Sequence, residues 1–495
     1  MQRAAVVICR VYALVRKGQA TWEFGQEGAV SKPTGVDVVS GPANISVDDL
    51  AEPLTYGVEA FTSPEYARAE ADRLWAKVWQ MAGRVEEIPE VGNYITYEIG
   101  ADSILIVRAA PDTLEAYHNV CPHRGRRLVS TPPGANRACG HKRAFVCGFH
   151  GWTFDLEGKN TFVLDPQDWK GALHERRKSL SKVEVDTWGG WIFINMDPGC
   201  GSLREYLEPA ARILDPFEFG KMHYKWRQWV IYPSNWKTAL EAFMEPYHVQ
   251  GTHPQLLKYG EFYAYSKAYG LHGVSGFDVR DPALRKTGGT SNTRAGKGPD
   301  PRVSTYELAR ENYETVNRAS TTETLVNAAK RLVDELPEGT PASDVIKHWL
   351  ASARADDAAR GVIWPMITPE QMSDAGLAWH LFPNLSVLQG VTFALCYRAR
   401  PYGDDPNKCI FESYAIERYP QGQEPKTEWV YAEPTAEKWG SVLAQDFSNM
   451  SEVQKGMKSR GFHGTLPNPH QERKITNFHR NLANYMGTGA PRLLE

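Results

Sequence analysis

The fold is decided by two short stretches of sequence, CPHRG at residues 121–125 and CGFHGW at residues 147–152. Each stretch offers one cysteine thiol and one histidine imidazole after a segment that is predicted to be a strand. Glycine follows closely in both stretches. It allows close backbone approach, so that backbone N–H groups can donate to sulfur. Two such loops can hold one metal centre between them.

Two cysteines and two histidines also suit a structural zinc site, and the ligand types alone leave that alternative open. In a zinc finger the two histidines normally lie together on one helix. Here each cysteine has its own histidine, with His123 two positions after Cys121 and His150 three positions after Cys147. This spacing favours an iron–sulfur cluster over zinc.

The two loops resemble those of Rieske [2Fe–2S] proteins, in which two cysteines hold one iron and two histidines hold the other. Imidazoles in place of thiolates raise the cluster potential, which suits a relay that accepts electrons from a low-potential ferredoxin or reductase. The resemblance implies four ligands and four supporting residues: the ligands Cys121, His123, Cys147 and His150, and the supporting residues Arg124, Gly125, Gly151 and Trp152.

A third pair of this kind, Cys139 and His141, lies between the two loops. We reject it as a ligand pair because only five residues separate His141 from Cys147, too few for two loops that grip one cluster. The interval from His123 to Cys147 holds 23 residues, more than is usual in the family that the loops resemble. We assign the excess to a loop at Pro132–Lys142, whose role stays open.

The stretch NWKTALEAFMEPYHVQGTH at residues 235–253 carries a second set of candidate ligands. A helix is predicted from its start to His248. On that helix Glu245 and His248 are i and i+3 and face the same side, so the carboxylate can hydrogen-bond to the imidazole. His253 lies five positions after His248, about 140° around a regular helix. Both histidines can bind one metal only if the helix breaks, and Pro246 and a later glycine supply the means.

Two histidines and one carboxylate on one face of an Fe(II) ion leave positions open for O2 and substrate, which is typical of non-haem iron oxygenases. The stretch 235–253 resembles the catalytic-domain motif of the Rieske non-haem iron oxygenases, N-W-K followed by Glu, an acid, Tyr-His and a second His. In that family the third ligand is an Asp on a late helix, which QDFSNM at 445–450 matches. The resemblance implies that the ligands are His248, His253 and Asp446; the rival carboxylates are Asp404, Asp405 and Glu412.

The motif departs from the family pattern at two positions. Ala242 stands where ring-hydroxylating dioxygenases usually have Asn, and Glu245 stands where the acid is often Asp. In the family this acid links a histidine ligand of the mononuclear iron to a Rieske histidine of the neighbouring subunit, which corresponds to His150 here. Glu is one methylene longer and keeps the same acceptor chemistry. Some members that act on quaternary amines carry Glu at this position.

The predicted fold class is α+β. The resemblance implies three parts: an N-terminal arm and helices packing on the catalytic domain over 1–76, an all-β Rieske [2Fe–2S] domain over 77–196, and a catalytic domain over 197–495 with the helix-grip (SRPBCC, START-like) fold and an antiparallel sheet. Further helices are predicted at 64–78, 304–336, 343–360 and 436–459, the last of which closes the pattern. Strands are predicted at 94–99, 103–107, 115–120, 144–147, 190–196, 377–388, 392–398 and 409–416, and a long loop at 270–300.

Composition sets the class of protein. The 495 residues include 56 Lys and Arg against 59 Asp and Glu, and 42% are hydrophobic, which excludes a disordered chain and a nucleic-acid binder by bulk charge. Seven cysteines do not make a disulfide framework. No apolar run is long enough to span a membrane, and Arg10 interrupts the apolar start. We expect a bacterial cytoplasmic protein with no membrane or nucleic-acid partner.

These motifs together predict the terminal oxygenase of a multicomponent system. Such an enzyme activates O2 at mononuclear Fe(II) and hydroxylates, cis-dihydroxylates or oxidatively demethylates a small organic substrate. An apolar, aromatic substrate is expected, because several apolar side chains could line a pocket: Phe243, Met244, Trp379, Phe382 and Leu385. No G-x-G-x-x-G occurs, so NAD(P)H is expected to act only through a separate reductase.

Three alternatives stay open. The chain could be a Rieske monooxygenase acting on a quaternary amine or another non-aromatic substrate, an electron carrier whose C-terminal half only binds a ligand, or a zinc-stapled binding protein. For the oxygenase, the expected partners are a ferredoxin and/or flavin reductase as electron donor. The expected assembly is a homotrimer, with or without a small beta subunit, because a closed head-to-tail ring brings the two metal centres of neighbouring chains together.

Overall fold

The computed structural model describes residues 46–259, 263–278 and 300–495. Most of the arm predicted at 1–50 and residues 279–299 of the predicted 270–300 loop lie outside these ranges. Within them, segments near the two ends pair as β1 (Leu54–Thr55) and β20 (Arg492–Leu493), with Leu54 opposite Leu493. Among the described residues, no helix is both long and apolar enough to cross a membrane.

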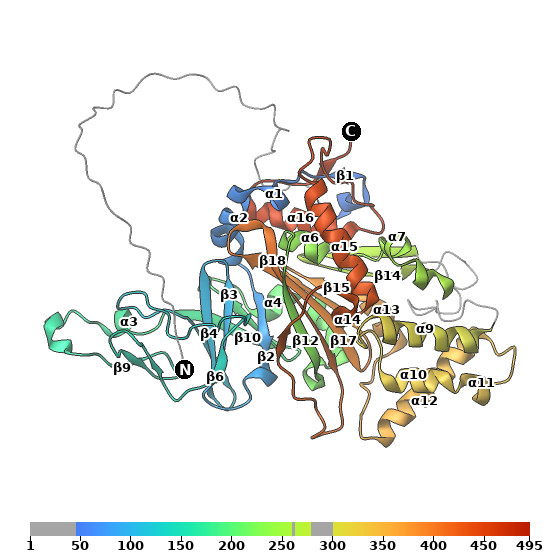
Figure 1. The fold of residues 1–495 in the computed structure, drawn as a ribbon, viewed down its shortest axis with the longest axis horizontal. Coiled ribbons are helices and arrows are strands. Elements are labelled where there is room, and N and C mark those ends of the chain that lie inside the picture. Colours follow the sequence, from blue (N-terminus) through green and yellow to red (C-terminus); the bar gives the residue numbers. More distant parts are fainter. Residues whose placement is uncertain (1–45, 260–262, 279–299) are drawn as a thin grey trace, which may run out of the picture. The chain divides into compact units, whose positions relative to one another are not determined.

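A seven-stranded antiparallel sheet forms what we call the β module, residues 80–195 (Figure 1). The five strands predicted in this region are confirmed. The sequence pattern misses β2, β6, β8, β9 and β10. In β2 all five residues are buried, so that no polar and apolar alternation is visible. In spatial order the strands are β2 (Gln80–Arg84), β11 (Trp191–Asn195), β10 (Lys182–Trp188), β5 (Thr113–His118), β4 (Asp102–Ala110), β3 (Asn93–Ile99) and β6 (Cys139–His141). A second, three-stranded sheet comprises β7 (Phe145–Val146), β8 (Thr153–Phe154) and β9 (Asn160–Phe162).

An eight-stranded sheet forms the core of the large module, residues 203–486. All its neighbouring strands are antiparallel except β12 and β19, which confirms the predicted antiparallel sheet and the α+β class. The predicted 270–300 loop is wrong at its start, because His272–Asp278 forms β14 between β13 and β15. The spatial order is β13 (Tyr263–Tyr269), β14, β15 (Ala378–Leu381), β16 (Leu385–Gln389), β17 (Phe393–Tyr402), β18 (Asp405–Glu417), β12 (His223–Tyr232) and β19 (Trp429–Tyr431).

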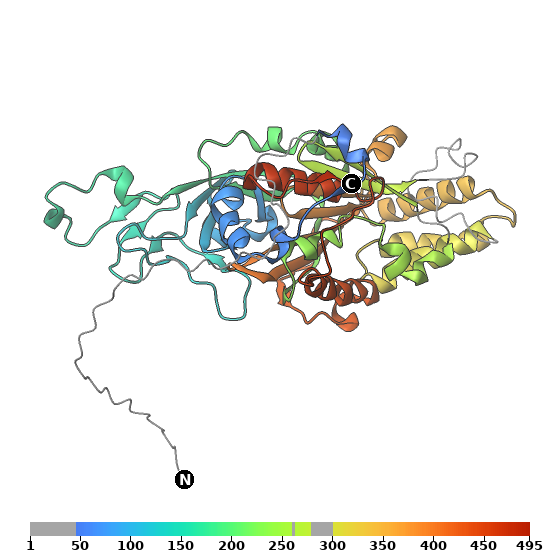
Figure 2. The same cartoon turned by 90° about the horizontal axis from the view of Figure 1, so that it is seen from above.

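Helices from both ends of the described chain pack against the large sheet. The predicted 436–459 helix is confirmed as α14 (Ala436–Trp439) and α15 (Ser441–Gly456), but it is not the last, because α16 (Arg473–Met486) follows. The period of α16 is visible in the apolar residues at 475, 478, 482 and 486, all of which are buried. α16 packs against β13 and β14 (Figures 1 and 2).

The helix predicted at 64–78 is confirmed as α2 (Pro64–Glu70) and a π-helical turn at Ala71–Trp75. Ser63 caps its start, since the Ser63 Oγ accepts from the Tyr66 N–H at 3.1 Å. Trp75 lies against Trp236 with ring centroids 5.0 Å apart, and Tyr66 of α2 belongs to the same buried cluster. α2 and the helices of the large module therefore share one buried core.

Five helices in residues 301–375 gather beside the large sheet. The predictions for 304–336 and 343–360 are confirmed, although the first region divides into three helices. α9, α10 and α12 pack against one another (Figures 1 and 2). The bounds are α9 (Pro301–Thr315), α10 (Glu323–Lys330), α11 (Leu332–Glu335), α12 (Ala342–Ala359) and α13 (Pro369–Ala375).

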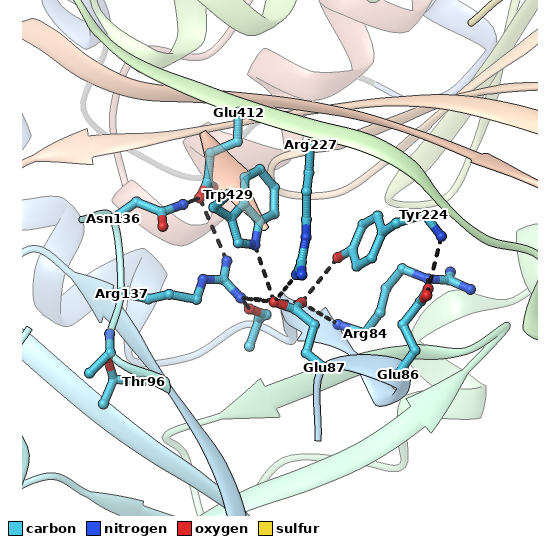
Figure 3. A network of polar contacts seen from close by, with 12 residues as sticks. Arg84, Glu86, Glu87, Thr96, Asn136, Arg137, Tyr224, Arg227, Glu412 and Trp429 are labelled. Atoms are coloured by element: carbon cyan, nitrogen blue, oxygen red, sulfur yellow. Dashed lines mark hydrogen bonds and ion pairs between the residues drawn. The ribbon is translucent and has the colours of Figure 1, made fainter. Parts of the chain in front are cut away.

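Glu412 of β18 is fully buried where the Pro132–Lys142 loop meets the large sheet (Figure 3). Its carboxylate accepts from the Arg398 Nε at 2.6 Å and from the Asn136 Nδ2 at 2.7 Å, and the Arg137 Nη2 lies 3.6 Å away. Burial by itself raises the pKa of Glu412, but the surrounding guanidinium groups, Arg398 first, outweigh burial and hold this pKa well below its usual value. Glu412 is therefore a charged structural residue.

Glu87 of the β module is the second buried carboxylate of this network (Figure 3). Its Oε2 accepts from the Arg227 Nη1 at 2.7 Å and from the Trp429 Nε1 at 3.1 Å, while its Oε1 accepts from the Tyr224 hydroxyl at 3.0 Å. The Arg137 Nη1 lies 3.3 Å from Oε2. Arg137 thus contacts a buried carboxylate of each module, which gives residues 132–138 a structural role. The predicted Pro132–Lys142 loop is wrong at its end, because Cys139–His141 forms β6.

Candidate metal centres

The first candidate loop closes on itself through its backbone. The Cys121 N–H donates to the Arg126 carbonyl at 2.8 Å, and the Gly125 N–H donates back to the Cys121 carbonyl at 3.0 Å. Gly125 has a φ of 75°, in the left-handed region that favours glycine. This closed turn fixes the direction of the cysteine side chain relative to the following residues.

The second loop repeats the same pattern. The Cys147 N–H donates to the Trp152 carbonyl at 2.8 Å, and the Gly151 N–H donates to the Cys147 carbonyl at 2.9 Å. Gly151 has a φ of 71°. The two loops thus share the same pair of backbone hydrogen bonds and a glycine with positive φ, although their sequences have only Cys, His and Gly in common.

Both cysteine thiols are buried and lie side by side. The N–H groups two and three positions after each cysteine donate to its sulfur. Burial raises the pKa of the Cys121 thiol. Burial acts the same way on Cys147, but the N–H groups of Phe149 and His150 outweigh it and lower the pKa of that thiol. Backbone donors aimed at sulfur also suit a bound iron–sulfur cluster.

The two histidines of the loops form the other half of the site. The rings of His123 and His150 meet edge to face with centroids 4.7 Å apart, and His123 stacks on Trp152 at 5.0 Å. The Nδ1 of His150 is buried and has no hydrogen-bond partner among the described residues. Two adjacent thiols, two adjacent imidazoles and an orphaned ring nitrogen fit the donor set of a Rieske [2Fe–2S] cluster. Arg124 lies over the ring of Phe149, which is 52% exposed, so this end of the site faces solvent.

The rejected pair lies elsewhere. Cys139 and His141 are exposed on β6, where they pair with β3, and His141 contacts the Asn93 amide.

The second candidate centre begins where helix α6 (Trp236–Glu241) ends. The predicted helix to His248 is therefore too long, and the break comes before Pro246. The contact expected from the i, i+3 spacing is nevertheless present, because a turn brings the same groups together. The His248 Nδ1 lies 2.8 Å from the Glu245 Oε1, and the His248 N–H donates to the Glu245 Oε2 at 2.9 Å.

The structure brings His248, His253 and Asp446 together. The Asp446 Oδ1, from α15, lies 3.0 Å from the His253 Nε2 and 3.5 Å from the His248 Nε2. One donor atom from each of the three residues lies within 4.8 Å of the others. The side chains of His253 and Asp446 are 2% and 5% exposed and that of His248 is 25% exposed, so the group is reached from the His248 side.

The outer nitrogen of each ring already has an acceptor. The His248 Nδ1 faces Glu245, and the His253 Nδ1 lies 2.7 Å from the Gln445 Oε1, which leaves both Nε2 atoms toward Asp446. Burial lowers the pKa of His248, but Glu245 and then Asp446 outweigh it and raise that pKa to about 9. A metal at this site therefore displaces a proton when it binds. Two imidazoles and one carboxylate fit Fe(II).

The rival carboxylates lie away from the histidine pair. Glu412 belongs to the buried ion network, and Asp404 is exposed in the turn after β17. Asp405 accepts from the Asn407 N–H at 2.9 Å at the start of β18.

The expected pocket residues do not form one lining. Met244 and Phe382 share the core that contains Phe447, whereas Trp379 and Leu385 pack in a different core. Phe243 stacks at 4.0 Å on Tyr397, whose pKa is raised by burial and by Asp446.

Two known protein families match this chain, and each match contains one of the two candidate centres. A family described as "Rieske [2Fe-2S] domain" matches residues 78–168, and a family described as "Ring hydroxylating alpha subunit (catalytic domain)" matches residues 217–488. The first match contains both cysteine loops, and the second contains the triad.

Individual proteins are similar over part of the chain. The glycine betaine monooxygenase oxygenase subunit of Pseudomonas aeruginosa is 31% identical over 190 residues, which are 38% of this chain and 42% of that protein. The benzene 1,2-dioxygenase subunit alpha of Pseudomonas putida is 31% identical over 245 residues, 45% of this chain and 53% of that protein. The matches thus span about half the length of these relatives. A quaternary ammonium Rieske monooxygenase solved with L-carnitine has a TM-score of 0.57 at 18% identity and covers 89% of this chain and 97% of that one, which is a likeness of fold.

Proposed function

The chain belongs to the ring-hydroxylating alpha-subunit family and carries a Rieske [2Fe–2S] domain ahead of the catalytic domain, and from this premise we propose that it is the terminal oxygenase of a multicomponent Rieske oxygenase. The observation that carries the proposal is the buried group of His248, His253 and Asp446 with both outer ring nitrogens occupied. In this proposal Cys121, His123, Cys147 and His150 hold the cluster.

The cofactors supply the redox chemistry when bound: the cluster donates electrons one at a time, and mononuclear Fe(II) activates O2 for insertion into the substrate. The protein's own part is to hold the ligands. Glu245 and Gln445 keep the two rings turned so that Nε2 faces the metal position. Burial of His253 and Asp446 limits the approach of water.

Glu245 has a second proposed role between chains. Its side chain contacts His248, which is the more open member of the triad, and Tyr247 beside it is 45% exposed. In a head-to-tail homotrimer, Glu245 would join His248 to His150 of a neighbouring copy, as the family motif implies. We propose a ferredoxin and/or flavin reductase as electron donor, and NAD(P)H only through that reductase.

The substrate is proposed to be a small organic molecule of one of two classes. Glu245 and the similarity to a glycine betaine monooxygenase favour a quaternary amine. The similarity to a benzene dioxygenase, at the same identity, and the aromatic pair Phe243 and Tyr397 favour an aromatic compound. An oxygen-uptake screen with a generic reductase shows which class of compound stimulates the reaction. Product analysis then checks the assignment, because quaternary amines release an aldehyde on demethylation whereas arenes give diols or phenols.

Metal analysis of protein purified without oxygen tests the proposal itself. We expect about three irons and two acid-labile sulfides per chain, with the visible and EPR spectra of a Rieske cluster. Two irons with two sulfides would leave only an electron carrier. A colourless protein that contains zinc would refute both iron sites.

Replacing Glu245 tests its role between the centres. Glu245→Gln should leave iron and sulfide contents unchanged and lower product formation by about 100-fold, because the amide keeps the shape but not the charge beside His248. Full activity of this variant would exclude the proposed bridge.

A further inference from the structure

The two ring nitrogens of His253 face consecutive residues of α15. The Gln445 Oε1 lies 2.7 Å from the His253 Nδ1, and the Asp446 Oδ1 lies 3.0 Å from its Nε2. His253 itself follows α7 (Val249–Thr252), in a segment far from α15 in sequence. The ring of a proposed metal ligand is therefore oriented by the helix that supplies another proposed ligand.

A third side chain contacts the same end of the Gln445 amide. The Gln255 Nε2 donates to the same Gln445 Oε1 at 2.9 Å. The Gln445 oxygen thus takes two donors, and its NH2 end points away from both. In this orientation the amide oxygen accepts from the ring, so the His253 Nδ1 carries the hydrogen and Nε2 keeps a lone pair.

His248 is oriented in a different way. Its Nδ1 faces the Glu245 carboxylate, which belongs to its own turn and lies only three residues away. One ring of the triad therefore has a charged acceptor and the other a neutral one. A neutral acceptor orients a ring without adding negative charge beside the metal position.

We propose that Gln445 is a positioning residue, locked by Gln255, which holds His253 in the tautomer and direction that the mononuclear metal requires. The inference rests on the proposed function, since it assigns these residues to the same metal site. It predicts that Gln445 sets metal affinity through His253 and not through general contact between α7 and α15.

The test is anaerobic titration of Fe(II) into protein whose mononuclear site has been emptied and whose Rieske spectrum is intact, followed by calorimetry. Gln445→Met keeps the length of the side chain and removes the acceptor, and it should weaken Fe(II) binding about 10- to 100-fold. Gln445→Glu restores an acceptor and should bind within a few-fold of the unmodified protein. Gln255→Met leaves the acceptor but frees it to rotate, so a smaller loss in the same direction is expected. The Co(II) absorption spectrum should change in Gln445→Met, because it reports the ligand field.

Asn449 supplies a matched control on the same helix. Its Nδ2 donates to the Thr252 Oγ1 at 3.2 Å, so it also joins α15 to α7 but touches no ring. Asn449→Ala should bind Fe(II) within twofold of the unmodified protein. An equal loss in Asn449→Ala, or unchanged binding in Gln445→Met, would overturn the inference alone. If the unmodified protein binds no Fe(II), the proposed function fails and the inference fails with it.

Discussion

The two candidate centres bring their ligands together by different routes. Each cysteine loop is closed by its own backbone within six residues, and the two loops repeat one conformation. The triad instead joins a turn after α6, the end of α7 and one position on α15. The geometry of the first centre is therefore set within two short segments of sequence. The geometry of the second depends on how α15 packs across the large sheet.

The buried ion network supports the same distinction. The Pro132–Lys142 loop belongs to the β module, yet Asn136 and Arg137 contact Glu412 of the large sheet. Each cysteine loop thus keeps its conformation through its own backbone hydrogen bonds. The module that carries these loops is attached to the large module through the contacts of Asn136 and Arg137.

Removing one ligand from each centre is the largest test of this comparison. Cys147→Ala should remove the cluster irons and sulfides together with the visible spectrum, because both loops grip one cluster. His248→Ala should remove only the mononuclear iron and leave the Rieske spectrum unchanged. Both variants should lose all product formation. Metal analysis and EPR distinguish them, and Cys139→Ala is the matched control, since that thiol is exposed. Loss of the Rieske spectrum in His248→Ala would show that the centres are not independent.

A smaller but still large effect is expected from Glu412→Gln. The change leaves Arg398 and its neighbours as uncompensated buried charges, which should lower the free energy of unfolding by about 3–5 kcal/mol. Denaturant unfolding measures this loss, and the Rieske spectrum of the folded variant should stay the same. Glu437→Gln, at a side chain that is 82% exposed, is the control and should change stability by less than about 0.5 kcal/mol. A loss below about 1 kcal/mol in Glu412→Gln would contradict the charged, structural role.

Acid should destabilise the large module through a histidine that binds no metal. His272 is buried, its Nε2 lies 2.8 Å from the Tyr206 carbonyl, and its Nδ1 accepts from the Phe382 N–H at 3.1 Å. Burial lowers its pKa from 6.5 to about 4, so the unfolded chain binds a proton that the folded chain does not in this interval. Stability should therefore fall as the pH drops from 6.5 to about 4, by about 3 kcal/mol from this group.

Urea unfolding at several pH values measures the slope for His272. His272→Gln should be less stable at pH 7 and show a flatter dependence on pH than the unmodified protein. Equal slopes would assign the acid sensitivity to other groups.

The smallest expected effect compares the two loops directly. Gly125→Ala and Gly151→Ala each place a Cβ on a backbone with positive φ, and the added atom meets no neighbour closer than 4.0 Å. Each change should therefore cost about 1–2 kcal/mol from backbone strain alone. Gly456→Ala in α15, with open space and no positive φ, should be neutral or stabilising. Thermal unfolding measures all three, and clearly unequal costs at 125 and 151 would show that the loops are not equivalent.

Whether a metal centre can be predicted from the sequence depends on how far apart its ligands lie along the chain. The cysteine loops are visible in sequence because their ligands, glycines and spacing lie within a few residues. The carboxylate partner of His248 and His253 depends on the resemblance to a family, since no spacing rule connects residue 446 to residue 253. The sequence does not reveal the role of Gln445, because its contact with His253 exists only in three dimensions.

The predictions that the structure contradicts also concern features that depend on contacts between distant residues. The helix predicted to His248 ends at Glu241, because apolar and polar residues can keep a helical period through a chain of turns. The sequence does not predict β14, because the residues that follow it have the composition of a loop. In the structure β14 pairs with β13 on one side and β15 on the other. The buried glutamates were not anticipated, since charged residues rarely indicate a core from sequence.

The pairing of β1 with β20 joins the first and last described segments, which affects the order in which the chain can fold during synthesis. On the ribosome the β module is complete as one continuous segment, so its sheet can form while synthesis continues. The core of the large module cannot close at that point, because Phe61 packs in the same cluster as Phe478, which is translated much later. The early helices therefore leave apolar surface uncovered until α16 has been translated, so we expect the core of the large module to close late in synthesis.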